Sequence, residues 1–152
     1  MRIYLARHGD ALPVTEDPER SLSETGRKRV SHVSNVLEQV GAGVDRMIHS
    51  GKPRARQTAE ILAQSVMREP GLETASDLNP MDPVEPWVDR AAKLEQDTML
   101  VGHLPFMSRL VTKLVTGEAD PELVGFPTGT VACLERTSEG KWIIVTVVCP
   151  GL

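Results

Sequence analysis

Aromatic residues are scarce in this chain of 152 residues, where they make up only 3% of the sequence. Proteins that bind single-stranded nucleic acid stack bases on aromatic side chains, so this class is disfavoured. The core must instead be aliphatic, and a chain of this length can bury a sizeable core without disulfides or metal. With 40% hydrophobic and 25% charged residues, we expect one soluble globular domain spanning residues 1–152.

The chain also has no excess of positive charge, because it contains 17 Lys and Arg but 21 Asp and Glu. The net charge of −4 offers no surface for neutralising the phosphates of DNA or RNA. Long apolar runs are absent too. The stretch Met1–Ala6 ends at Arg7 and is too short for a signal peptide or a membrane span. We therefore expect a cytoplasmic protein with neither nucleic acid nor membrane as a partner.

Cysteine is limited to Cys133 and Cys149, which fit no paired spacing of metal ligands. If residues 130–135 and 142–148 form a hairpin, Cys133 faces a position near Ile144. The two thiols are then out of register, so we predict that both are buried and reduced.

Short apolar runs alternate with segments of helical period. The pattern predicts a helix after the N-cap Ser23 and another with Pro53 in its first turn. Predicted strands cover 2–6, 46–49, 72–75, 98–101, 130–135 and 142–148, and predicted helices cover 24–40, 53–66, 87–94 and a segment from 105. Helices between the earlier strands require parallel crossovers. We expect an α/β fold: a three-layer α/β/α sandwich whose sheet is mostly parallel, with antiparallel C-terminal strands.

Polar side chains follow three of these strands: Arg7-His8-Gly9 after the first, Ser50 and Arg54 after the second, and His103 after residues 98–101. Ligands of such sheets bind beyond the carboxyl ends of the strands. Guanidinium groups present forked donors that suit a tetrahedral oxyanion. One neutral imidazole can act as a nucleophile while the other donates to phosphoryl oxygens. The pattern predicts a phosphate pocket.

A zinc site built from His8, His49 and His103 is the metal alternative. Their spacing includes no local histidine pair, and two arginines in the pocket would repel a cation. We predict neither a metal nor a cofactor, and we interpret His49 as structural.

Four segments in this order resemble the histidine phosphatase superfamily, also called the phosphoglycerate mutase-like fold. Within it, the chain is most similar to the short phosphohistidine phosphatases of the SixA type. The segments are Arg7–Ala11, Arg20–Gly26, Ser50 with Arg54–Ala59, and Val101–His103. Together they extend over almost the whole chain.

The resemblance implies that His8 is the nucleophile that accepts the phosphoryl group, and that Arg7, Arg54 and His103 bind its oxygens. It further implies that Arg20 lines the pocket. Gly9 and Ser50 are additional candidates for substrate binding, although Ser50 can equally cap the helix that follows it.

Larger members of the superfamily carry a glutamate that protonates an alkoxide leaving group, whereas the matching stretch here reads Asp77-Leu78-Asn79-Pro80. Imidazole is a weaker base than an alkoxide and leaves phosphorus more readily without a proton. We therefore expect phosphohistidine on a phosphorelay (histidine phosphotransfer) protein as the substrate. Four carboxyls stay open as substitute acids: Asp10, Asp77, Asp82 and Glu85.

Two other functions stay open: a small-molecule phosphomonoesterase, and a phosphate-binding module without catalysis. A mutase is the least favoured, because its chemistry needs the absent acid and an enclosing pocket. Short loops predict an open pocket that a protein-borne phosphohistidine can reach. We take a monomer as the default.

Overall fold

The computed structural model describes residues 1–151, and all the predicted strands and helices are present in it. The strands are β1 (Arg2–Arg7), β2 (Arg46–His49), β3 (Leu72–Thr74), β4 (Thr98–Gly102), β5 (Val131–Arg136) and β6 (Trp142–Val148). The helices are α1 (Glu24–Gln39), α2 (Pro53–Val66), α3 (Glu85–Lys93) and α4 (Phe106–Thr116). Only element ends differ from the sequence prediction, each by a residue or two.

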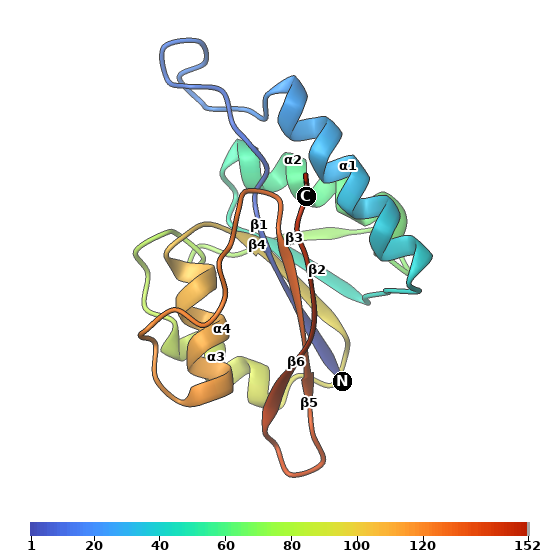
Figure 1. Ribbon diagram of the computed structural model, residues 1–152, viewed down its shortest axis with the longest axis vertical. Coiled ribbons are helices and arrows are strands. Elements are labelled where there is room, and N and C mark those ends of the chain that lie inside the picture. The colour runs from blue at the N-terminus through green and yellow to red at the C-terminus, as the bar shows by residue number, and fades with distance from the viewer. Residues whose placement is uncertain (152) are drawn as a thin grey trace.

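One six-stranded sheet has the order β3-β2-β4-β1-β5-β6. The four strands from β3 to β1 pair in parallel, and β5 and β6 pair antiparallel. In Figure 1, α1 and α2 lie on one side of the sheet, and α3 and α4 lie on the other. The predicted α/β architecture, mostly parallel with antiparallel C-terminal strands, is confirmed.

The central strand β1 is buried on both faces of the sheet, as the alternation of its side chains shows. Ile3 and Leu5 belong to the core on the α3 and α4 side, whereas Tyr4 and Ala6 belong to the core against α1 and α2. Successive side chains of a strand point to opposite faces. A strand covered on both faces therefore reads as a continuous apolar run, which is why the parallel strands carry little polar alternation.

Local sequence signals set the starts of the helices that follow β1 and β2. Ser23 Oγ accepts a hydrogen bond of 3.0 Å from the Gly26 amide, which confirms the predicted N-cap of α1. Pro53 opens α2, but the N-cap residue there is Lys52, with no capping side chain. Ser50 is therefore not the cap of α2.

The C-terminal hairpin differs from the sequence prediction because its register shifts between Cys133 and Leu134. Cys133 pairs with Thr146, and Leu134 takes the place opposite Ile144. An extra residue at such an irregularity displaces the pairing by one position, which spacing alone does not reveal. Both thiols are free, but Cys149 is only half-buried, so the prediction of two buried cysteines is wrong for Cys149.

Gly26 lies where the first turn of α1 meets the chain just after β1. A Cβ atom at this position would lie 2.2 Å from the Asp10 carbonyl oxygen. Gly26→Ala should therefore push α1 away from the end of β1 and destabilise the protein by about 2 kcal/mol, a usual cost of overpacking. Urea unfolding measures this change.

The matched control is Gly125→Ala, since a Cβ there meets nothing within 4 Å. It should unfold at nearly the urea concentration of the unchanged protein. Equal stability of the two variants would show that the contact between α1 and Asp10 is not tight.

Candidate active site

The parallel pairing of β1 with β4 brings two histidines together. Arg7 lies opposite Gly102 in the register, and the His8 amide donates to the Gly102 carbonyl at 2.9 Å. His8 and His103 each follow one of these strands, and their ring centroids lie 5.1 Å apart. Both side chains are buried. The predicted meeting of His8 and His103 is found.

His8 is held with one ring nitrogen bound and the other free. Nδ1 lies 2.7 Å from the Gly9 carbonyl oxygen, which can only accept, so Nδ1 carries the proton. Burial, reinforced by the positive charges of Arg54, Arg7 and Arg20, lowers the pKa of His8 to about 4. At neutral pH the ring is therefore uncharged, with its lone pair on Nε2. This is the form that can attack phosphorus.

The arginines around His8 carry positive charge that no carboxylate pairs. Among residues 1–151, none of the ion pairs includes Arg7, Arg20 or Arg54. Arg7 Nη1 donates to the Phe126 carbonyl at 2.7 Å, but Nε of Arg7 and Nε of Arg54 are buried without a partner. Burial lowers the pKa of both guanidinium groups. Such donors are poised for an anion.

Arg20 reaches the site from the loop between β1 and α1. Its backbone has φ 53, a left-handed conformation that is uncommon outside glycine. Nε donates to the Leu12 carbonyl at 3.2 Å, and the charge of Arg20 lowers the pKa of His8 and of Arg54. The role of Arg20 in lining the pocket stays a prediction.

Ser50 contacts His103, with Oγ lying 2.7 Å from Nε2. Ser50 Oγ also accepts from the Lys52 amide at 3.4 Å, so its own hydroxyl hydrogen is available to donate to Nε2. Nδ1 of His103 is buried and unpartnered. Burial, followed by the neighbouring His8, lowers the pKa of His103 to about 3. At neutral pH His103 is therefore a neutral imidazole next to the ring of His8.

Sequence reasoning missed two groups that support this site. Thr58 on α2 accepts from the Gly9 amide at 3.0 Å and donates to the Arg54 carbonyl at 2.7 Å. Residues 126–130, just before β5, bond to the backbone of Arg7 and of His8. Thr58 lies in the segment Arg54–Ala59 that carries the resemblance, but no role was predicted for it. Residues 126–130 offered only the run of turn-forming residues Pro127-Thr128-Gly129, which carries no chemical motif.

Gly9 has a packing reason to be glycine. A Cβ there would lie 2.6 Å from Cγ2 of Val30 on α1, so a side chain would separate the helix from the phosphate site. Its amide is already used by Thr58. The predicted contact of Gly9 with substrate stays a prediction.

Asp77, one of the four candidate acids, is engaged elsewhere. Its carboxylate lies 2.7 Å from Arg90 and accepts from the Trp87 indole at 3.1 Å, and Arg90 lowers its pKa. An ionised carboxylate with these partners cannot donate a proton. Asp82 accepts from the Asn79 amide at 2.9 Å, which also ties it to its own loop.

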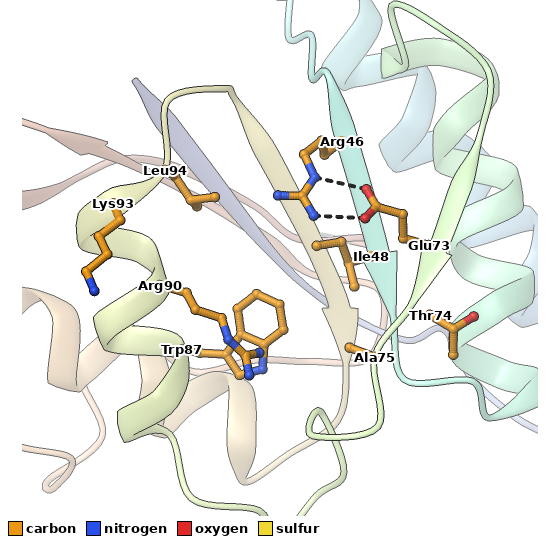
Figure 2. A pocket seen from close by; sticks show the side chains of 9 residues that line it. All are labelled: Arg46, Ile48, Glu73, Thr74, Ala75, Trp87, Arg90, Lys93 and Leu94. Atoms are coloured by element: carbon orange, nitrogen blue, oxygen red, sulfur yellow. Dashed lines mark hydrogen bonds and ion pairs between the residues drawn. The ribbon is translucent and has the colours of Figure 1, made fainter.

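Arg90 and Trp87 belong to a hollow of about 390 Å³ between α3 and the strands β2 and β3. Figure 2 shows the Arg90 guanidinium beside the Trp87 ring, at 4.5 Å from its centroid, and Arg46 bound to Glu73 through two hydrogen bonds. The other lining residues are Ile48, Thr74, Ala75, Lys93 and Leu94. None of the predicted site residues lines this hollow.

His49 has a structural partner, because its Nδ1 accepts from the Gly51 amide at 3.0 Å. Within residues 1–151, no three side chains of His, Cys, Asp or Glu are grouped so that they could hold a metal ion. In the same part of the chain, no helix has the length and apolar character needed to cross a membrane.

Comparison with known proteins agrees with this geometry. Residues 3–83 match the family described as Histidine phosphatase superfamily (branch 1). An uncharacterized protein of Picosynechococcus is 31% identical over 130 residues, covering 81% of this chain and 78% of the relative. Phosphohistidine phosphatase SixA of Escherichia coli is 26% identical over 146 residues, covering 93% and 89%. The solved structure of the protein histidine phosphatase SixA complexed with tungstate superposes with a TM-score of 0.83 at 25% identity, covering 97% and 96%.

The low pKa of His8, about 4, couples stability to pH. In the unfolded chain a histidine protonates near pH 6.5, so between about pH 6.5 and 4 the unfolded state binds more protons than the folded state. The free energy of unfolding should therefore decrease as pH falls through this window. His8→Ala should flatten this dependence, as measured by urea unfolding across the pH range.

The matched control is His32→Ala, because His32 is exposed on α1. It should retain the slope of the unchanged protein. A His8→Ala slope equal to that of His32→Ala would contradict the buried, neutral state of His8.

Arg54 and Arg56 lie in the same turn region of α2 and provide a matched pair for oxyanion binding. Arg54 has a buried, unpartnered Nε, whereas Arg56 is exposed and pairs with Glu60 at 3.5 Å. Arg54→Ala should weaken binding of inorganic phosphate at least about tenfold, the usual value of a charged hydrogen bond. Arg56→Ala should change it little. Equal weakening in isothermal titration would place the anion outside this pocket.

Proposed function

This chain belongs to the histidine phosphatase superfamily and is a phosphatase, and on that premise we propose that His8 is its nucleophile. One observation carries the proposal: the bond from Nδ1 to Gly9 leaves the lone pair of Nε2 free beside the unpartnered donors of Arg7, Arg54 and His103. In this proposal those three residues bind the oxygens of the phosphoryl group. Arg20 lines the pocket, and Gly9 and Ser50 complete the substrate-binding set.

The proposed reaction has two displacements at phosphorus. In the first, Nε2 of His8 attacks, the N–P bond forms, and the bond to the leaving group breaks. The guanidinium groups and the Nδ1–H of His103 stabilise the negative charge of the oxygens. In the second, water attacks phosphorus, the N–P bond breaks, and phosphate departs while His8 returns to its neutral form.

We further propose that the substrate is phosphohistidine on a phosphorelay protein, and that the reaction needs no metal. The engagement of Asp77 with Arg90 and Trp87 supports a leaving group that needs little help from an acid, and imidazole is such a group. Two guanidinium groups already supply the positive charge that a metal would bring. Similarity to a phosphohistidine phosphatase supports the same substrate class. A cytoplasmic location and a monomeric state stay predictions.

The test compares hydrolysis of a phosphorylated histidine phosphotransfer domain with hydrolysis of a panel of sugar and nucleotide monophosphates. We expect a higher kcat/KM on the protein substrate, because imidazole leaves without an acid. In both assays His8→Ala should lower kcat by at least about a thousandfold, as expected for a nucleophile.

An acid-labile phosphoryl group should be trapped on the unchanged protein and not on His8→Ala. A higher kcat/KM on the monophosphates would instead identify a small-molecule phosphomonoesterase. Failure to trap the group with any donor, together with absent turnover, would identify a binding module. Full activity of His8→Ala would overturn the mechanism.

A further inference from the structure

Asp10 lies two residues after the proposed nucleophile, and both of its carboxylate oxygens are engaged. Oδ1 accepts from the hydroxyl of Thr128, and Oδ2 accepts from Arg29 Nη1 at 3.2 Å. Donors from this chain therefore occupy both oxygens of the carboxylate. The role of Asp10 therefore depends on the residues that its carboxylate binds.

Thr128 belongs to the segment 126–130, which carries three hydrogen bonds to the site. The Phe126 carbonyl accepts from Arg7 Nη1 at 2.7 Å. The Thr130 carbonyl accepts from the Arg7 amide at 2.9 Å, and the Gly129 amide donates to the His8 carbonyl at 2.9 Å. The Phe126 bond is the only one of the three made to the guanidinium itself. The position of residue 126 thus decides where this guanidinium points.

Asp10 is fixed independently of this segment. Its backbone carbonyl accepts from the Ser23 amide at 2.9 Å, and a Cβ on Gly26 would overlap it. The bond between Asp10 and Thr128 therefore joins a fixed point at the start of α1 to the irregular segment before β5. Burial lowers the pKa of Arg7, and the negative charge of Asp10 partly offsets that lowering.

We propose that Asp10 and Thr128 are positioning residues for the phosphate contact of Arg7: their hydrogen bond holds Phe126 so that its carbonyl aims the Arg7 guanidinium at the phosphoryl oxygens. This inference rests on the proposed function, in which Arg7 binds the transferred group. It assigns Asp10 a role other than that of a leaving-group acid.

Thr128→Val tests this role, because valine keeps the shape of threonine and removes the hydroxyl. Tungstate affinity and kcat/KM on a phosphate monoester should both fall about tenfold, the usual value of a hydrogen bond to a charged group. Thr128→Ser retains the hydroxyl and should recover both values to within about twofold of the unchanged protein. Arg29→Ala should have little effect, since its exposed pair with Asp10 contributes little.

The deciding measurement combines Thr128→Val with Arg7→Ala. If Thr128 acts through Arg7, tungstate affinity of the double variant should equal that of Arg7→Ala alone. If Thr128 has a purely structural role, Thr128→Val should lower tungstate affinity by the same factor in the unchanged protein and in Arg7→Ala, and that result would overturn the proposal. Unchanged tungstate affinity of Thr128→Val would also overturn it. If Thr128→Val fails to fold, Asp10→Asn replaces it in the same cycle.

Tungstate binding needs no turnover, so this result is independent of whether His8 is the nucleophile. A loss of affinity in Thr128→Val with full activity of His8→Ala would overturn the proposed function and leave the positioning role intact. Full loss of activity in His8→Ala with unchanged tungstate affinity of Thr128→Val would overturn the positioning role and leave the proposed function intact.

Discussion

The parallel pairing of β1 with β4 is the constraint on which the site depends. These strands are separated by about ninety residues of chain, yet their register sets Arg7 opposite Gly102. The residue after each strand is a histidine, so the pairing alone brings His8 and His103 together. A slip of one residue would exchange the side chains of β1 that pack against α3 and α4 with those that pack against α1 and α2. Close packing on both faces therefore holds this register.

The electrostatics of the site follows from the burial of arginine charges that no carboxylate pairs. Arg7 and Arg54 bring positive charge into a partly desolvated crevice that contains no paired carboxylate, and a buried unpaired charge is costly. Burial, reinforced by the neighbouring positive charges, lowers the pKa of His8 to about 4 and that of His103 to about 3. The unpaired charge of the arginines also favours a bound anion. These buried, unpaired charges lower the stability of the folded protein, as is usual at functional sites.

Support for the site comes from elements that contribute no chemistry of their own. Thr58 joins the Gly9 amide to the start of α2, and Ser50 Oγ contacts Nε2 of His103. The segment 126–130 bonds to the backbone of Arg7 and of His8. The candidate site at the end of the parallel strands is thus supported by α2, by the loop after β2, and by the chain entering β5.

The sequence alone determined the α/β architecture and the element positions, and it supplied the candidate residues of the site, because apolar period, caps and the residues at strand ends are local signals. His8, Arg54 and His103 were predictable because each directly follows a strand or opens a helix. Only the tertiary structure decided which side chains support them and which are unavailable. Asp77 is tied to Arg90, and Thr128 reaches Asp10 across 118 residues of chain. Such pairings depend on which surfaces the packed helices bring together, and no local pattern encodes that.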